Sequence, residues 1–378
     1  MSTKIKNIVQ VALCALLIFG LSITCWFKPA ETFSQSENKV LAQFPELNLE
    51  TLANGQFMSG FESYTQDQFP LRDEFIGIKN FTSLNVLQQM DTNDIYLEDG
   101  YLAALVYPLS EKSLDRVSDH FAHLYKNIFS KGEGNVYLSV IPDKGYFLAE
   151  KNGYLSIDYQ KMIDLLKEKN PDFKYIDITG LLSIDDYYFT DTHWRQDKIV
   201  DVAQNLASEM GVELSGNFKT NVLDKKFDGV YLRQLNLPLK GDTITYLTAD
   251  HFDGCTVTRY NYDSKTNKIV PTVMGMYDDK KAESYDPYEM FLSGAQELIT
   301  IDNPNATTDK ELVIFRDSFG SSISPLLTEA YSRITIVDLR YIKSTSVAPI
   351  CKMLGIELEN ADALFLYSTL ILNNASFI

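Results

Sequence analysis

The sequence predicts an α/β protein: a parallel β-sheet with helices on both faces, a β-rich insertion and an N-terminal transmembrane helix. Three observations predict this architecture. Short apolar runs alternate with amphipathic helical patterns between residues 135 and 366, and parallel strands need helical crossovers. Residues from about 215 to 305 interrupt the alternation with turn clusters and short Tyr- and Val-rich runs. A long apolar segment precedes both regions.

The apolar segment runs from Ile8 to Phe27 and is broken by the polar residue Gln10. Its length is sufficient to cross a bilayer as a helix. Lys4 and Lys6 precede it, and the positive-inside tendency then places the amino terminus in the cytoplasm and the bulk of the chain outside the cell. A cleaved signal peptide is the alternative, although no small-x-small site follows the segment. The sequence therefore predicts a single-pass protein of the cell membrane.

The composition describes an acidic, globular chain. It has 378 residues, 45% of them hydrophobic, and a formal net charge of -17. This negative field repels nucleic acid and argues against DNA or RNA as a partner. Two of the four cysteines lie in the apolar segment, which leaves Cys255 and Cys351. They form neither a disulfide framework nor a metal-binding pattern, although they could form one bridge or stay as two free thiols.

A polar tether at residues 31–55 is expected to follow the stub and anchor at residues 1–30. Residues 56–378 then form one domain that contains the insertion. Pro70 separates two helical patterns, and a Glu-Asp-Gly turn joins two strands into a hairpin. The expected helices lie at residues 57–67, 71–89, 110–129, 159–169, 195–210, 321–331 and 347–354. The expected strands lie in the hairpin at 94–105 and at residues 135–141, 174–178, 311–315, 334–339 and 363–366.

Ser318 lies at a corner between a strand and a helix. The apolar run Leu312–Phe315 is followed by a polar turn and then by a helical pattern. A serine at such a corner projects its hydroxyl above the sheet edge, where backbone N–H groups and the positive end of the helix can stabilise developing negative charge. Ser318 is therefore a candidate nucleophile. The alternative is that Asp317 or Ser318 only caps the helix.

His193 and Asp191 form a candidate partner for this serine. They lie in the connection between a predicted strand and a helix, so both corners are expected at the carboxyl edge of one parallel sheet. Residues two apart in an extended segment point to the same side. Asp191 can then orient the imidazole while its other nitrogen faces the hydroxyl. The alternative is a structural Asp-His pair at the start of the following helix.

The other three histidines give a weaker pattern. His120 and His123 are three residues apart beside Asp119, a spacing that could hold a metal, but a third ligand is lacking nearby. A partly solvated helix face explains them better, and His251 reads as a loop residue. The sequence therefore predicts no metal site.

Several motifs resemble one protein family. Asp191–Trp194, preceded by two tyrosines, and Arg316–Phe319 after an apolar strand resemble the DHHW family of Gram-positive bacteria. Asp67–Asp73 is similar to the family's "DxFPxRD", and Glu98–Leu102 to its "kDGwL". The family is related to the periplasmic alginate O-acetyltransferases, whose catalytic domains are SGNH-hydrolase-like. The resemblance implies that fold for residues 56–378, with Ser318 as nucleophile, His193 as base and Asp191 as the orienting acid.

The resemblance also implies an oxyanion site. The backbone N–H groups of Ser318 and Phe319 would stabilise the tetrahedral intermediate. The segment Phe291–Ala295 is similar to a family segment usually written with Gly-Asn, and Ala295 replaces the asparagine. Gly294 could still offer a backbone N–H there.

Three further positions belong to the same motifs. Thr192 stands where the family's namesake motif has its first histidine; the alginate enzymes also have threonine there, which favours acetyl transfer. Trp194 and Arg316 are candidates for substrate binding. Trp194 could stack on a sugar face, with core packing as the alternative.

The function implied is a membrane-anchored, extracytoplasmic O-acetyltransferase that modifies a cell-surface polysaccharide through an acetyl-enzyme. Acetyl-coenzyme A is not expected outside the cell, so the resemblance implies no cofactor and a multi-spanning membrane acyltransferase as the acetyl donor. Two alternatives remain: a carbohydrate esterase with the same triad, and a non-catalytic cell-surface or sporulation-related binding protein.

Overall fold

The computed structural model describes residues 2–37, 39–263 and 268–377, which form two compact units. The first consists of Met1–Thr92 with Leu232–Leu239, and the second of Asn93–Tyr231 with Lys240–Ile378. Residues 56–92 thus fall in the first unit, whereas the sequence places them with the catalytic domain. The reason is that these residues lie in separate helices that do not continue the sheet.

The first unit begins with the apolar helix α1 (Thr3–Phe27), which is long and apolar enough to cross a membrane. It is followed by the short strands β1 (Phe33–Ser34) and β2 (Lys39–Val40), and by the helices α2 (Leu49–Ala53), α3 (Gln56–Asp67) and α4 (Arg72–Phe81). A π-helical turn at Thr82–Val86 continues α4, so the helix expected at 71–89 changes its geometry after Phe81.

Hydrogen bonds attach part of the segment that was expected to be a tether to the end of α3. The Asp67 carboxylate accepts hydrogen bonds from Lys39 Nζ at 2.7 Å and from the Ala42 N–H at 2.8 Å. The Gln68 side chain bonds both the N–H and the carbonyl of Glu31, at 2.9 and 2.8 Å. These contacts come from the "DxFPxRD"-like motif, whose role in the structure is therefore to fix residues 31–42.

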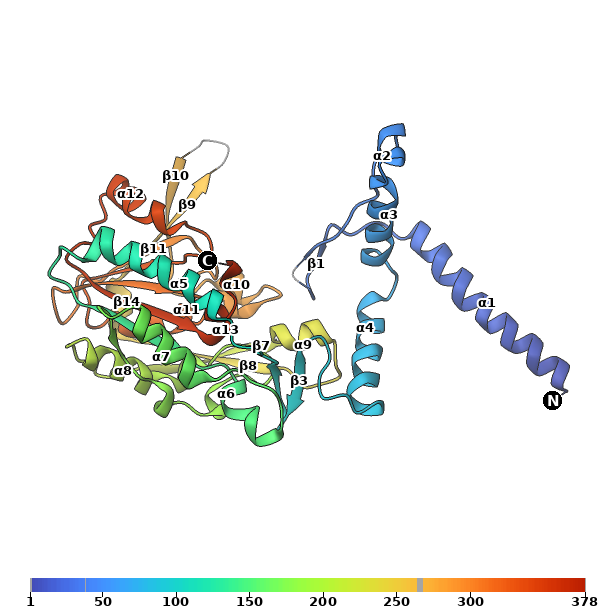
Figure 1. The fold of residues 1–378 in the computed structure, drawn as a ribbon, viewed down its shortest axis with the longest axis horizontal. Coiled ribbons are helices and arrows are strands. Elements are labelled where there is room, and N and C mark those ends of the chain that lie inside the picture. Colours follow the sequence, from blue (N-terminus) through green and yellow to red (C-terminus); the bar gives the residue numbers. More distant parts are fainter. Residues whose placement is uncertain (1, 38, 264–267, 378) are drawn as a thin grey trace. The chain divides into compact units, whose positions relative to one another are not determined.

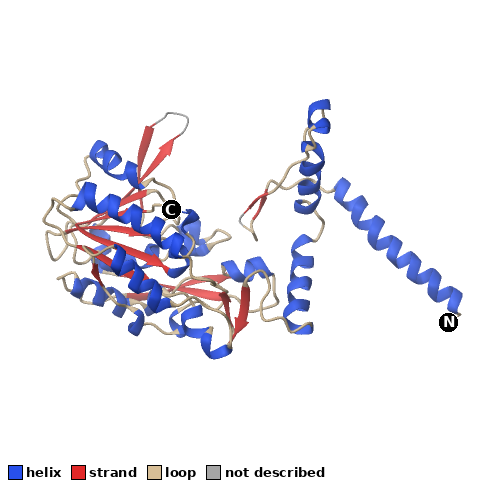
Figure 2. Ribbon diagram, in the orientation of Figure 1, coloured by secondary structure: helices blue, strands red, loops and turns tan. Residues whose placement is uncertain are grey.

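The second unit contains an eight-stranded sheet within the described residues, in the order β10-β9-β11-β13-β12-β14-β5-β6 (Figures 1 and 2). The strands are β5 (Val136–Ile141), β6 (Lys174–Tyr175), β9 (Thr256–Asp263), β10 (Lys268–Met274), β11 (Leu298–Asp302), β12 (Glu311–Arg316), β13 (Arg333–Val337) and β14 (Asp362–Ser368). From β13 to β6 all pairs are parallel, which confirms the predicted parallel core of the sheet. β11, β9 and β10 add to it antiparallel.

Helices cover both faces of this sheet, as predicted. Along β12, Leu312 and Ile314 pack into one buried apolar cluster and Val313 and Phe315 into the other, because successive side chains of a strand point to opposite faces. The first cluster includes residues of α8 (Val200–Glu209) and α11 (Gly320–Ile323). The second includes residues of α5 (Glu111–Leu124), α7 (Tyr159–Lys169) and α12 (Ser344–Leu354).

Shorter elements complete the second unit. They are the hairpin of β3 (Ile95–Glu98) and β4 (Tyr101–Ala104), the pair β7 (Lys219–Phe227) and β8 (Asp242–Thr248), and the helices α6 (Gly145–Leu148), α10 (Asp279–Ala282) and α13 (Thr369–Leu372). The helix α9 (Val230–Leu235) begins in the second unit and ends in the first. The helix expected at 321–331 is shorter than predicted: α11 gives way to a 3-10 turn at Ser324–Leu327, where Pro325 lacks a backbone donor.

The insertion is β-rich, as expected, and part of it belongs to the main sheet. β7 and β8 pair only with each other, whereas β9, β10 and β11 extend the main sheet at one edge. Cys255 and Cys351 are free thiols; the alternative of a bridge between them is not realised.

Candidate functional site

The structure brings Asp191, His193 and Ser318 together in one hydrogen-bonded chain. His193 Nε2 lies 2.8 Å from Ser318 Oγ, and His193 Nδ1 lies 2.6 Å from Asp191 Oδ1. A neutral imidazole with its proton on Nδ1 donates to the carboxylate and accepts from the hydroxyl. These residues come from loops at the carboxyl ends of β6 and β12, which belong to the parallel part of the same sheet.

The turn that carries Ser318 is fixed by Asp317. This fully buried carboxylate accepts the Phe319 N–H at 3.0 Å on one oxygen, and the N–H and hydroxyl of Ser368 at 2.8 and 2.6 Å on the other. Gly320 follows where a Cβ would lie 2.6 Å from the Arg316 side chain. The chain can therefore reverse sharply after β12 and present Ser318 at the sheet edge.

The loop that carries His193 is fixed by the insertion. The Asp242 carboxylate, at the start of β8, accepts the N–H groups of Phe189 and Thr190, both at 2.8 Å. The Gly229 N–H donates to Thr190 Oγ1 at 3.0 Å. A Cβ at Gly229 would lie 2.4 Å from the Asp191 backbone nitrogen, so only glycine permits this approach. The insertion thus holds the backbone of the loop that carries Asp191 and His193.

Asp191 is held as a carboxylate. Its Oδ1 accepts the His193 N–H at 3.0 Å as well as the ring nitrogen, and its Oδ2 accepts the Val230 N–H at 2.8 Å. Burial alone would raise the pKa of Asp191, but the imidazole and these N–H groups outweigh it and hold the pKa below its usual value. The ionised acid can then stabilise an imidazolium at His193.

Two aromatic rings pack against the imidazole. The Tyr288 ring stacks on His193 with centroids 3.9 Å apart and an interplanar angle of 10°, and Phe319 packs at 4.8 Å. Tyr288 is buried, and its hydroxyl lies 3.1 Å from Ser322 Oγ. The sequence analysis missed Tyr288, because it lies in a 3-10 turn of the insertion (Pro287–Met290) that carries no motif.

Two candidates for substrate binding are fully buried instead. Trp194 donates through Nε1 to the Phe319 carbonyl at 3.1 Å and to Ser322 Oγ at 3.0 Å, so its alternative role in the core is the one the structure supports. Arg316 has no exposed surface, and its guanidinium contacts Asp338 at 3.2 Å and the Gly294 carbonyl at 3.3 Å. Both side chains hold the loops around the triad and do not reach a substrate.

The expected oxyanion donors differ in availability. The Phe319 N–H is bound to Asp317, and the Gly294 N–H donates to the Phe291 carbonyl at 3.1 Å. By contrast, the Ser318 N–H donates to no other group among the residues that the structure describes. Of the three N–H groups, that of Ser318 is therefore the one left available for an oxyanion, and the other two are engaged within their own turns.

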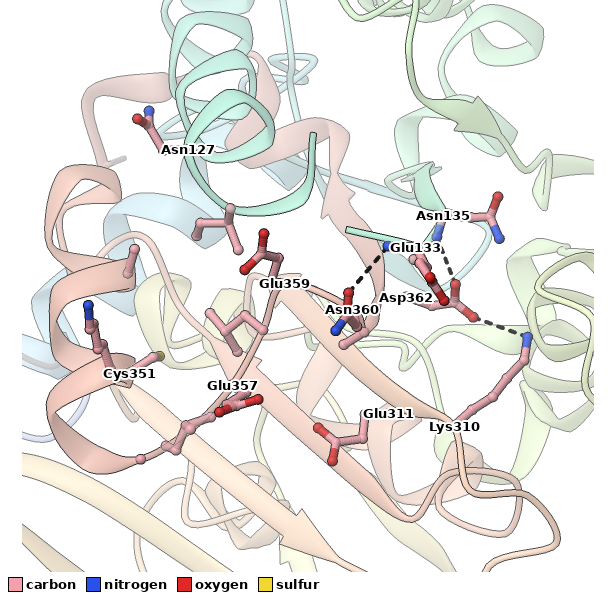
Figure 3. A pocket seen from close by; sticks show the side chains of 18 of the residues that line it. Asn127, Glu133, Asn135, Lys310, Glu311, Cys351, Glu357, Glu359, Asn360 and Asp362 are labelled. Atoms are coloured by element: carbon pink, nitrogen blue, oxygen red, sulfur yellow. Dashed lines mark hydrogen bonds and ion pairs between the residues drawn. The ribbon is translucent and has the colours of Figure 1, made fainter. Parts of the chain in front are cut away.

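A pocket of about 860 Å³ lies at the opposite end of the sheet (Figure 3). It is lined where strands begin, by Glu311 of β12 and Asp362 of β14. Asp362 accepts hydrogen bonds from the Asn135 N–H at 2.9 Å and from Lys310 Nζ at 3.3 Å. Because Ser318 follows the other end of β12, this pocket is not part of the triad's surroundings.

The remaining histidines lie elsewhere. His120 Nδ1 contacts Ser344 Oγ at 2.9 Å, His123 Nδ1 contacts Asn127 Nδ2 at 3.3 Å, and His251 lies in the 3-10 turn before β9. Across residues 2–37, 39–263 and 268–377, no three His, Cys, Asp or Glu side chains are grouped so as to hold a metal ion.

The fold is shared with known structures. A DHHW family protein from Eubacterium siraeum DSM 15702 gives a TM-score of 0.60 at 21% identity, over 75% of this chain and 93% of that chain. Bacillus cereus PatB1, solved with a sulfonyl adduct, gives 0.59 at 17% identity, over 76% and 98%. No family model and no curated protein sequence matches the chain. These likenesses confirm the fold that the resemblance implies.

Proposed function

We propose that the chain is a membrane-anchored, extracytoplasmic O-acetyltransferase that modifies a cell-surface polysaccharide. The observation that carries this proposal is the 2.8 Å contact between His193 Nε2 and Ser318 Oγ, backed by Asp191. A hydroxyl in this position can lose its proton to the imidazole as it attacks a carbonyl carbon. This arrangement supports acyl transfer through a serine ester.

The reaction divides into two balanced steps. Ser318 Oγ forms a bond to the acetyl carbon of a donor ester, its proton passes to His193 Nε2, and the donor's alcohol leaves with that proton. A sugar hydroxyl then gives its proton to His193 and attacks the acetyl-serine, and Ser318 Oγ recovers the proton as it leaves. In both steps the Ser318 N–H binds the oxyanion, and Asp191 stabilises the imidazolium.

The helix α1 supports a location at the membrane. It is long and apolar enough to cross a bilayer and has no buried residue, which fits a membrane anchor with the sheet domain outside the cell. The acetyl donor would then come through the membrane, and a multi-spanning membrane acyltransferase is the partner that such transfer requires. A cell-surface glycan is the acceptor, and the triad needs no cofactor.

PatB1 supplies a chemical probe for this proposal. Its structure with a sulfonyl adduct indicates that a protein of this fold can react with a sulfonyl reagent. Sulfonyl fluorides modify activated serine hydroxyls. We expect such a reagent to add one sulfonyl group to Ser318 of the full chain in detergent, as detected by intact mass and peptide mapping.

The deciding experiment incubates the full chain with an acetyl ester, with and without an oligosaccharide acceptor. We expect acetylated sugar, and we expect Ser318→Ala to lower turnover on the order of a thousandfold or more. Ser321→Ala is the matched control, because Ser321 Oγ is buried in the same turn with no hydrogen-bond partner among the described residues.

The two alternatives give different results. Acetate release that is unaffected by added sugar would identify an esterase, in which water replaces the sugar hydroxyl. Surface acetylation that is unchanged in cells carrying Ser318→Ala would leave a binding protein without catalysis.

A further inference from the structure

A buried lysine contacts the loop that carries Asp191 and His193, and it has no role in the reaction described above. Lys144 follows β5 and is 3% exposed. Its Nζ donates to the carbonyl of Tyr188 at 3.0 Å and to the carbonyl of Phe189 at 3.3 Å. Both carbonyls belong to the loop that carries Asp191 and His193, so the ammonium group lies against the triad's own backbone.

The turn around Lys144 directs its side chain inward. The Asp143 carboxylate accepts the Gly145 N–H at 2.6 Å, the Tyr159 hydroxyl at 3.1 Å and the Thr369 hydroxyl at 2.6 Å. A Cβ on Gly145 would lie 2.7 Å from that carboxylate. The turn is therefore fixed on both sides of Lys144, whose side chain is buried.

The surroundings of the ammonium leave its charge uncompensated at short range. The Tyr101 and Tyr231 rings lie 5.9 and 5.2 Å from Nζ, and among the described residues no carboxylate oxygen is within 4 Å of it. The acidic groups that face it are more distant: Asp143 in its own turn, Asp191 in the catalytic loop and Asp242 in β8.

Packing alone does not explain a lysine at this buried position. Removing an ammonium from water is unfavourable unless it is paired, and an apolar side chain of similar length would fill the same space. Burial lowers the pKa of Lys144 to about 7, although Asp191, Asp242 and Asp143 oppose the shift. The charge is therefore present below neutral pH, and groups with such shifted titration often serve a reaction.

We propose that Lys144 is a positioning residue whose positive charge opposes protonation of His193, so that the imidazole stays a base under mildly acidic conditions. Asp191 attracts a proton to His193, and an ammonium that interacts with Asp191 counteracts part of that attraction. The ammonium form of Lys144 increases as the pH falls below about 7. This inference rests on the proposed function, because it concerns the base of that triad.

The test measures the titration of the imidazole itself. The chain has four histidines, so the signals of His193 in the ¹⁵N-histidine-labelled full chain in detergent can be assigned by their loss in His193→Gln. In Lys144→Met we expect the midpoint of the His193 titration to rise by about one pH unit. Lys151→Met is the control, because the Lys151 side chain is 53% exposed and pairs with Asp99. It should leave the midpoint unchanged.

A second variant separates charge from hydrogen bonding. Lys144→Gln keeps a donor for the two carbonyls but has no charge, so it should raise the His193 midpoint as Lys144→Met does. An unchanged or lowered midpoint in either folded variant overturns the proposal. If both variants unfold, the Lys144 Cε signal in the ¹³C-lysine-labelled wild-type chain decides: a midpoint near 7 supports the proposal, and one near the ordinary value of about 10.4 overturns it.

This titration does not depend on activity. If the wild-type chain fails to transfer acetyl groups and Ser318 does not react with a sulfonyl fluoride, the proposed function fails. The His193 midpoints still show whether Lys144 acts on the imidazole. If acetyl transfer is found, the acidic limb of its rate against pH should move to higher pH in Lys144→Met.

Discussion

The His193 side chain is held at both nitrogen atoms and by two aromatic rings. Asp191 and Ser318 contact the nitrogens, the Tyr288 ring stacks on the imidazole, and the Phe319 ring packs against it at a tilt. An imidazole held in this way has a single orientation toward the hydroxyl. The precision of the contact with Ser318 therefore depends on Asp191, Tyr288 and Phe319 together.

Tyr288 should matter through its ring and not through its hydroxyl. Tyr288→Leu removes the stacked surface, so we expect a loss in kcat of roughly a hundredfold with little change in KM, since small displacements of catalytic groups have effects of this size. Tyr288→Phe keeps the ring and should stay within a few-fold of wild type. Steady-state rates of acetyl transfer measure both, and equal losses in the two variants would contradict a role for stacking.

Asp191 should act only through His193. Asp191→Asn removes the carboxylate that fixes the imidazole tautomer, and we expect kcat to fall on the order of 10³–10⁴-fold. In a Ser318→Ala background the same change should have little further effect, because members of a triad are not additive. Rates for the two single variants and the double variant test this, and fully additive losses would show that Asp191 acts independently of the nucleophile.

At the level of elements, the insertion packs closely against the loop that carries Asp191 and His193. Gly229→Ala places a Cβ 2.4 Å from the Asp191 nitrogen, so we expect it to destabilise the chain by about 1–3 kcal/mol and to lower the rate. Gly180→Ala is the control, because a Cβ there meets nothing within 4 Å. Thermal unfolding and acetyl-transfer rates of both variants provide the comparison; a Gly229→Ala chain as stable and active as wild type would show that the loop can retreat.

The sequence predicted the elements in which burial determines the spacing of apolar residues. β5, β12 and β14 are continuous apolar runs, and α5 and α7 are amphipathic. Their neighbours in the sheet fix where Asp191, His193 and Ser318 emerge, so these three could be predicted as a group. The burial of Trp194 and Arg316 could not be predicted, because adjacency in the chain does not show which way a side chain points. Tyr288 and Lys144 could not be found, since only tertiary contacts bring them to the loop.

Over the whole molecule, Lys144 should make stability depend on pH. The unfolded chain holds the proton of a lysine up to a pH of about 10.4, whereas burial lowers the pKa of Lys144 in the folded chain to about 7. Between these values the unfolded state binds more protons, so the contribution of Lys144 to stability rises with pH. Below pH 7 the contribution of Lys144 to stability is least favourable and no longer changes with pH.

The measurement compares wild type with Lys144→Met in urea at pH 7, 8, 9 and 10, using the fluorescence of the buried Trp194. We expect the stability of wild type relative to Lys144→Met to increase over this range. A difference that stays constant with pH would show that Lys144 titrates normally in the folded chain.

The attachment of residues 31–42 to α3 determines how far the folded chain can travel from the bilayer. Only residues 28–30 separate the end of α1 from Glu31, which Gln68 holds, and three extended residues span about 10 Å. Trp26 and Phe61 also pack with ring centroids 6.3 Å apart. In a chain anchored by α1, these contacts therefore keep α3 close to the lipid surface.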